Sequence, residues 1–164
     1  MRLLKLGLIS LIGLSIVITL MSLLIPSTAR VSRAITIEAP IDSVRYRVQE
    51  LDQWQNWNLL VQHDQQTNLS FTKEAVHSDQ MEVRFLKADT GAIYTEWKQK
   101  GQEPVSSAFT ITYSANATIL QWYFDFKVKW YPWEKFGSII FDRQMGPPME
   151  RSLDRLRKEV LKLN

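Results

Sequence analysis

The sequence contains no cysteine among its 164 residues. Disulfide bonds, thiol catalysis and thiolate metal sites are therefore excluded. Histidine is also scarce: only His63 and His77 are present, and neither belongs to an H-x-x-x-H or H-E-x-x-H pattern. We therefore expect no metal site, and we interpret both histidines as surface residues in polar loops.

The short motifs of common cofactor and hydrolase sites are absent as well. The sequence has no G-x-S-x-G, no P-loop and no G-x-G-x-x-G pattern. Ser106 and Ser107 have no base close to them in the sequence. Neither a bound cofactor nor serine-type hydrolysis is therefore expected.

An excess of basic charge is lacking in most of the chain. Four of the 20 basic residues lie near the N-terminus, at Arg2, Lys5, Arg30 and Arg33, whereas all 17 acidic residues follow Arg33. The remainder thus carries 16 basic and 17 acidic residues. This balance argues against a nucleic-acid partner, which requires a concentrated basic surface. The basic N-terminal residues suit a membrane surface better.

A long apolar run is present from Leu6 to Ile25, with twenty residues and no charge. This length is sufficient for a helix to span a bilayer. Signal-peptide cores usually have about 7–15 apolar residues, so the run predicts an uncleaved single-pass anchor, with a cleaved signal peptide as the alternative. Arg2 and Lys5 favour an inside N-terminus and a domain on the outer, periplasmic face. We expect residues 1–30 to form the anchor and a polar connector, and residues 31–164 one domain.

The first part of this domain predicts a strand followed by two helices. Ile35 and Ile37 alternate with polar residues, which is typical of a half-buried strand. Pro40 suits the first turn of a helix, and apolar residues follow it at helical spacing. The pair Trp54 and Trp57 would lie on one side of a second short helix.

Five strands are then predicted, separated by segments rich in turn residues. They cover residues 69–76, 81–88, 92–100, 106–114 and 117–129. Successive hairpins imply an antiparallel meander. The inward-facing residues on four of these strands are expected to be Met81, Val83, Phe85, Ile93, Thr95, Trp97, Phe109, Ile111, Tyr113, Leu120, Trp122, Phe124, Phe126 and Val128. The charged residues Arg84, Glu96 and Asp125 fall on the outward phase.

The C-terminal segment predicts a long amphipathic helix. Its apolar face contains Met149, Leu153, Leu156 and Val160. Gly146, Pro147 and Pro148 precede this face and are expected to break or kink the chain. A sheet with one apolar face must be covered, and this helix is the longest element available. The predicted class is therefore α+β.

Several of these segments together resemble a known superfamily. They are "VSRAITIEAPIDSVRYRV", "LDQWQNW" and "DRQMGPPMERSLDRLRKEV", in this order. The chain is similar to membrane-anchored bacterial members of the START-like, or SRPBCC, superfamily, which includes polyketide cyclases and lipid-transfer domains. Ser152 stands where many relatives have glycine. The resemblance implies the helix-grip fold, in which a curved antiparallel sheet wraps around the C-terminal helix and often leaves a cavity.

The resemblance also implies a hydrophobic or amphipathic ligand, possibly a lipid, between sheet and helix. The expected cavity lining is Phe85, Thr95, Trp97, Trp122, Phe124, Leu153 and Leu156. Aromatic residues fill cores as readily as they line pockets, so composition does not separate a hollow domain from a filled one. Two alternatives therefore stay open: an enzyme of cyclase or hydrolase type, and a ligand-free protein-interaction domain.

The segment "FKVKWYPWEKF", from Phe126 to Phe136, combines tryptophan, tyrosine and lysine. Such residues favour the membrane interface and anionic head groups. The segment is therefore expected either to rest on a membrane or at a cavity mouth, or to cover one end of the core as an ordinary loop.

Overall fold

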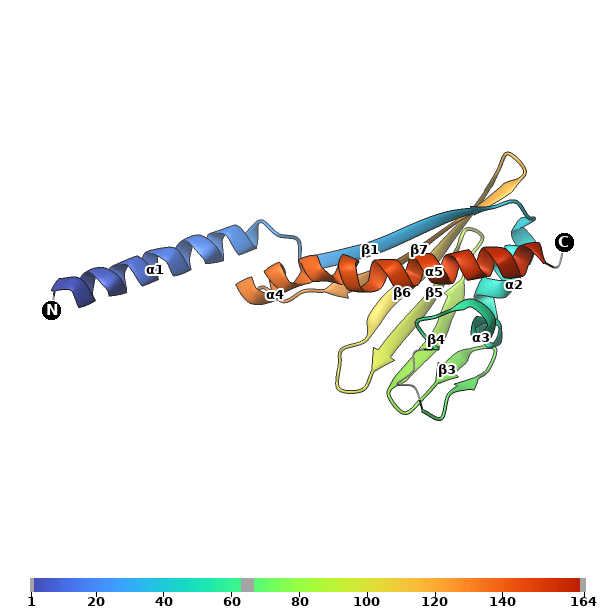
Figure 1. Ribbon diagram of the computed structural model, residues 1–164, viewed down its shortest axis with the longest axis horizontal. Helices are drawn as coiled ribbons and strands as arrows, with labels where there is room; N and C mark the ends of the chain where they lie inside the picture. The colour runs from blue at the N-terminus through green and yellow to red at the C-terminus, as the bar shows by residue number, and fades with distance from the viewer. Residues whose placement is uncertain (1, 63–66, 163–164) are drawn as a thin grey trace.

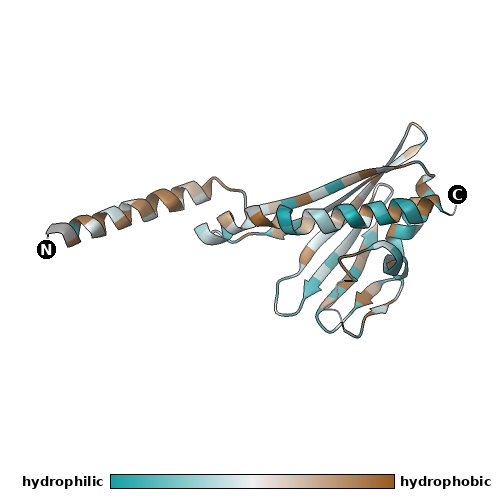
Figure 2. Cartoon of the chain, viewed as in Figure 1, coloured by the Kyte–Doolittle hydropathy of each residue, from teal (hydrophilic) through white to brown (hydrophobic). Residues whose placement is uncertain are grey.

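The computed structural model describes residues 2–62 and 67–162, so His63 lies outside the described residues. The apolar run forms helix α1 (Arg2–Leu23), which projects away from the remainder of the chain (Figure 1). Its residues Leu4–Leu23 are long and apolar enough to cross a membrane, and only 6% of the most apolar 18-residue window is buried. Figure 2 shows that α1 is mainly hydrophobic along its length.

The sheet has seven strands, and all neighbours are antiparallel. They are β1 (Thr28–Ile37), β2 (Ser70–Phe71), β3 (Ala75–His77), β4 (Met81–Ala88), β5 (Ala92–Gln99), β6 (Val105–Ser114) and β7 (Ala117–Lys127). The order is β1-β7-β6-β5-β4-β3-β2. Strands β2 to β7 thus form a meander, and β1 pairs with β7 at the edge of the sheet. The predicted meander is confirmed.

Two strand boundaries differ from the sequence prediction. One strand was expected over residues 69–76, but β2 and β3 form a short hairpin there because Thr72 makes a turn. The Ala75 N–H donates to Thr72 Oγ1 over 3.0 Å, and the Thr72 N–H donates to the Ala75 carbonyl over 2.8 Å. The polar connector expected before β1 was also too long, since Thr28 already pairs with Lys127 of β7.

The helical elements after β1 are α2 (Ile41–Gln49), the 3-10 turn η1 (Leu51–Gln53), α3 (Trp54–Trp57), α4 (Pro132–Gly137), the 3-10 turn η2 (Ser138–Ile140) and α5 (Phe141–Leu161). Of these, α2, α3 and α5 cover one face of the sheet, whereas α4 lies against α1. In Figure 1, α5 runs alongside β1 in front of the sheet. Its predicted apolar face is confirmed, because Met149, Leu153, Leu156 and Val160 are all buried in the core.

The expected break at the two prolines was wrong, because α5 continues through Pro147 and Pro148. Proline has no N–H, so the carbonyls of Arg143 and Gln144 lack their ordinary helical donors. These two residues are exposed, and their carbonyls therefore need no partner inside the protein. One turn later, the Ser152 hydroxyl donates to the Pro148 carbonyl and accepts the Leu59 N–H. The buried Ser152 thus connects α5 to the segment after α3.

The core contains a cluster of six aromatic rings. Centroid separations of 4.9–6.3 Å link Trp54, Trp57, Trp97, Phe109, Trp122 and Phe124. The Trp54 and Trp57 indole N–H groups donate to the Val48 and Arg47 carbonyls, at 2.9 and 3.1 Å. The tryptophan pair therefore has a packing role between the short helix and the sheet.

The strand alternation is confirmed at most positions, with three departures. Tyr113 was expected to point inward but is 50% exposed; it lies next to the β6–β7 turn, where it pairs with Thr118. Phe85 is only partly buried, and the β4–β5 register shifts just after it. Phe126 is likewise only partly buried, against Phe141. Arg84, Glu96 and Asp125 are not buried, as predicted for the outward phase.

Candidate ligand groove between the sheet and helix α5

A groove of about 1000 Å³ lies between one end of the sheet and the N-terminal half of α5, and it is open to solvent on one side. Three parts of the chain line it. They are the segment after α3 (Leu59, Leu60, Gln62), the ends of the central strands with their turns (Gln80, Met81, Trp97, Gln99, Lys100, Gln102), and α5 (Arg143, Gln144, Met145, Pro147, Pro148, Arg151). Ligand pockets usually have volumes of about 300–1000 Å³.

The sheet topology explains why these parts meet. In an antiparallel meander, alternate turns lie at the same end of the sheet. The β3–β4 and β5–β6 turns therefore adjoin, and the Lys100 N–H donates to the Gln80 carbonyl over 2.8 Å. Gly101 makes the β5–β6 turn with φ of +76°, in the left-handed region that favours glycine. The groove is thus a consequence of strand order and turn position.

Trp97 forms the boundary between the groove and the aromatic core. Its side chain lines the groove, yet the residue is only 7% exposed. Its ring lies 5.1 Å from that of Phe124 and 5.8 Å from that of Trp54. The indole N–H donates to Thr95 Oγ1 over 3.2 Å, so the polar edge of the ring already has a partner inside the protein. An apolar ligand would therefore contact the hydrocarbon surface of Trp97.

Among the seven residues expected to line a cavity, Trp97 is the one that lines this groove. Trp122, Phe124, Leu153 and Leu156 are fully or almost fully buried in the core beside it. The buried Thr95 lies behind Trp97, and its cross-strand neighbour Phe85 packs against the core. The structure thus brings Thr95, Trp122 and Phe124 into contact with Trp97, and Leu153 and Leu156 belong to the same core. Their contact with a ligand stays a prediction.

The sequence analysis missed the α5 residues of the groove. Arg143, Gln144, Met145 and Arg151 surround the two prolines, where a helix break was expected. A continuous helix would have placed positions 144, 147, 148 and 151 on one face, because residues three and four apart are neighbours. The spacing of Gln144 and Arg151 on either side of the prolines could therefore have predicted this wall of the groove.

The rim of the groove is cationic. Lys100, Arg143 and Arg151 line it, and no carboxylate of the described residues does. None of these three cations forms an ion pair with another residue in the described ranges 2–62 and 67–162. Five glutamine side chains supply further donors and acceptors: Gln62, Gln80, Gln99, Gln102 and Gln144.

The carboxylates on the same half of α5 face away from the groove, toward β1. Arg33 Nη1 lies 2.8 Å from Asp142 Oδ1, and Arg33 Nε lies 2.5 Å from Glu150 Oε1. Hydrogen bonding to Arg33 holds the pKa of Asp142 below its ordinary value, and the same bond raises the pKa of Arg33. Acidic charge is thereby neutralised on the β1 side of the helix, which leaves the groove side cationic.

The described lining residues offer cations, amides and apolar surface, without a histidine or carboxylate for acid–base chemistry. The buried hydroxyls near the core are hydrogen-bonded, since Ser107 Oγ accepts the Trp122 indole N–H over 2.9 Å. Across the described chain, no group of three or more His, Asp or Glu residues could hold a metal ion. The arrangement therefore favours binding of an amphipathic molecule.

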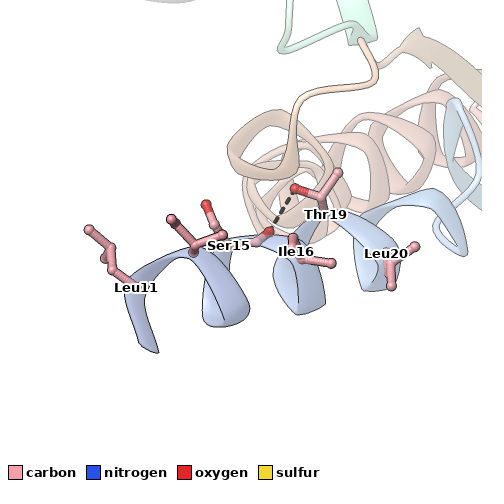
Figure 3. Close-up of a pocket in the computed structure, with 6 residues that line it drawn as sticks. Leu11, Ser15, Ile16, Thr19 and Leu20 are labelled. Carbon is pink, nitrogen blue, oxygen red and sulfur yellow. Dashed lines mark hydrogen bonds between the residues drawn. The ribbon is translucent and has the colours of Figure 1, made fainter. Parts of the chain in front are cut away.

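A second hollow, on α1, is not a comparable site. Leu11, Ile12, Ser15, Ile16, Thr19 and Leu20 line it, and all come from one helix. Figure 3 shows these side chains along one face, with the Thr19 hydroxyl bonded to the Ser15 carbonyl at 2.8 Å. The hollow is the space between neighbouring side chains of an exposed apolar helix.

A curved antiparallel sheet that holds a long C-terminal helix defines a START-like protein with the helix-grip fold. Residues 28–161 match the family described as polyketide cyclase / dehydrase and lipid transport, and the chain belongs to this family. The START-like resemblance seen in the sequence is therefore confirmed. Some members of this superfamily are cyclases, and the fold generally binds hydrophobic ligands.

Solved structures of low sequence identity share the fold. A START superfamily protein from Mycobacterium smegmatis is 16% identical, with a TM-score of 0.58, and the match covers 82% of this chain and 99% of that one. A truncated norcoclaurine synthase from Thalictrum flavum is 11% identical, with a TM-score of 0.59, over 82% and 94%. A Staphylococcus aureus protein of unknown function is also 11% identical, with a TM-score of 0.61, over 82% and 96%. A comparison with curated proteins gave no match.

Proposed function

We propose that the protein is a membrane-tethered binding domain that holds an amphipathic small molecule between the sheet and α5. The groove beside Trp97 carries this proposal, because its volume of about 1000 Å³ is sufficient for a lipid-sized molecule. Membership of a family that includes lipid transport supports it. The ligand's apolar part would contact Leu60, Met81, Trp97 and Met145.

The cationic rim selects the class of amphiphile. Lys100, Arg143 and Arg151 surround an apolar surface, and no described carboxylate of the lining competes for them. Guanidinium groups bind carboxylates and phosphates through paired, charge-assisted hydrogen bonds. We therefore assign to the groove a ligand with an apolar chain and an acidic head group, such as a fatty acid or an anionic lipid.

The tether is α1. Its apolar side chains are exposed, with Leu4 at 83% and Leu24, just beyond the helix, at 85%. A continuous apolar surface of this size is unfavourable in water but is stabilised in a bilayer. Arg2 and Lys5 favour an inside N-terminus, which would put the binding domain on the outer, periplasmic face.

The first experiment is native mass spectrometry of the full chain, purified from host membranes in mild detergent, followed by lipid extraction. We expect an acidic lipid or fatty acid at near-stoichiometric amount. Purification of a chain shortened at its N-terminus would show that α1 is a cleaved signal sequence. A chain that stays empty when offered host lipids would favour a filled core and a protein-interaction role.

A matched pair of variants locates the ligand. Met145→Trp places an indole in the groove, because Met145 lines it. Leu161→Trp adds the same group at the end of α5, where Leu161 is 40% exposed. Retention of the ligand should fall in the first variant and stay unchanged in the second. Equal retention in both variants would exclude this groove as the site.

A further inference from the structure

Among the side chains that the structure describes between β7 and α5, four large apolar ones are exposed. Trp130 is 61% exposed, Trp133 71%, Phe136 42% and Ile140 51%, and we call these residues the exposed patch. Trp133, Phe136 and Ile140 are spaced as i, i+3 and i+7, so the helical run of α4 and η2 presents them on one face. Trp130 joins them through Tyr131, whose ring stacks on that of Trp133 at 5.0 Å.

Lys135 fixes this segment to the end of α1. It lies within α4 and is only 3% exposed, an unusual position for an ammonium group. Its Nζ donates to the Ile25 carbonyl over 2.7 Å and to Ser27 Oγ over 3.0 Å. Ile25 and Ser27 lie in the short connector between α1 and β1, so the lysine ties α4 to this connector. The exposed patch is therefore held beside the residues where the apolar helix ends.

The patch, the anchor and the groove lie at the same end of the sheet. β7 ends at Lys127, which pairs with Thr28 at the start of β1, immediately after α1. Because neighbouring strands are antiparallel, β6 begins at this end and β5 finishes at it, which places the groove-lining β5–β6 turn there too. Figure 1 shows α4 and the N-terminal half of α5 at the end of the domain that faces α1.

The exposed patch continues directly into α5. Ile140 is followed by Phe141, and the groove lining begins two residues later at Arg143. The exposed patch and the groove lining are therefore adjacent along the chain. Exposed cations are also nearby, since Lys127 and Lys129 precede the patch and are both exposed.

We propose that the exposed patch inserts into the interfacial layer of the same bilayer that α1 spans, and so holds the mouth of the groove at the membrane surface. Tryptophan is enriched at this depth, and the flanking lysines would contact anionic head groups. An amphiphile could then pass between the bilayer and the groove without crossing bulk water. This proposal rests on the tether assigned to α1, and its test separates the two.

The absence of cysteine allows a direct test in the full chain. Single-cysteine variants carry a nitroxide spin label at Trp133→Cys or Phe136→Cys in the patch, at Ile12→Cys in α1, and at Tyr113→Cys as a water-exposed control. Tyr113 lies beside the β6–β7 turn, at the opposite end of the sheet, and is 50% exposed. Each variant is reconstituted into vesicles of phosphatidylcholine and phosphatidylglycerol. Collision with oxygen, which concentrates in lipid, is compared with collision with a water-soluble nickel chelate.

We expect the oxygen-to-nickel ratio at positions 133 and 136 to exceed that at position 113 several-fold, and position 12 to give the highest ratio. If positions 133 and 136 match position 113 while position 12 stays lipid-exposed, the patch does not insert, although the tether stands. Low collision with both reagents at position 133 would indicate a protein contact, such as a second copy, and would overturn the proposal. A water-exposed position 12 would overturn the tether and, with it, the insertion of the patch.

Discussion

The Arg33 guanidinium, carried by β1, lies directly over Gly146 in α5. A Cβ at position 146 would meet the Arg33 side chain, with Cζ at 2.8 Å. Asp142 and Glu150 lie four residues on either side of Gly146, and both pair with Arg33. The three helix positions form one ridge, and the arginine side chain lies across it. Gly146 thus leaves room for the Arg33 side chain between β1 and α5.

Gly146→Ala should destabilise the protein slightly. The methyl group displaces the Arg33 guanidinium, which then cannot keep both ion pairs. Each of these partly exposed pairs contributes at most about 1 kcal/mol, whereas alanine gains about 1 kcal/mol in helix propensity, so we expect the free energy of unfolding to fall by no more than about 1 kcal/mol. Thermal unfolding of the detergent-solubilised full chain checks this.

A double variant tests whether the effect of Gly146→Ala depends on Arg33. Once Arg33 is already shortened, in Arg33→Ala, the added methyl group has nothing to displace. The Gly146→Ala change should therefore cost much less in that background, as double-mutant cycles detect for residues in contact. An equal cost with and without Arg33 would show that the glycine is needed for another reason.

Asp142 predicts a dependence of stability on pH. Its pKa in the folded protein lies below the ordinary value of 3.8, because Arg33 donates hydrogen bonds to it. The stabilisation is therefore fully present above about pH 4 and is lost as the pH falls through the lowered pKa. The stability difference between the native protein and Asp142→Asn should be constant near neutral pH and shrink below about pH 4.

Denaturant unfolding at several pH values measures this difference. Asp154→Asn is the matched control, because Asp154 is exposed on the same helix and forms no ion pair with the residues that the structure describes. Its effect should show no comparable change between neutral and acid pH. A difference for Asp142 that stays unchanged at acid pH would contradict the role of the Arg33 bond.

The cationic rim predicts selectivity for charged head groups. Arg143→Gln and Arg151→Gln should each weaken binding of oleate by about 1 kcal/mol, or about fivefold, since partly exposed charge pairs have this size. Binding of oleyl alcohol, which has the same chain without the charge, should be unchanged. Native mass spectrometry with increasing ligand measures both affinities.

Arg157→Gln is the control for this prediction. Arg157 is exposed on α5 but does not line the groove. The variant removes the same charge from the same helix, so its effect on oleate reports only the general field of the protein. If Arg157→Gln weakens oleate binding as much as Arg143→Gln does, the rim has no specific role.

Local patterns predicted the fold well, because each pattern has a direct physical cause. Alternation placed Leu120, Trp122 and Phe124 in the core, since one face of β7 is covered by helices. The same rule failed at Tyr113, close to the β6–β7 turn, because strand alternation does not report where a strand ends. The prolines of α5 were misinterpreted for a related reason. The cost of a missing hydrogen bond is small where the freed carbonyls face solvent.

The groove was harder to predict, because its wall combines residues that are remote in sequence. Leu60, Met81, Trp97 and Met145 come from four segments, and their meeting depends on the strand order and the position of α5. Trp97 could be predicted from alternation alone, whereas the contribution of Met145 depends on where α5 packs against the sheet. Of the seven residues expected to line a cavity, Trp97 lines the groove, and Thr95, Trp122 and Phe124 contact Trp97 from the buried side.

Lys135 gives the last prediction, which concerns the junction between the anchor and the domain. Lys135→Met keeps much of the apolar stem but removes the hydrogen bonds to the Ile25 carbonyl and Ser27 Oγ. A buried acceptor without its donor costs about 1–3 kcal/mol, so this junction should loosen while the sheet stays folded. A spin label at position 133 should then become more mobile in vesicles. Lys158→Met removes an exposed lysine near the other end of α5 and should leave the label unchanged. If the label is equally restricted in both variants, Lys135 does not hold the exposed patch against α1, and insertion into the bilayer must fix the patch by itself.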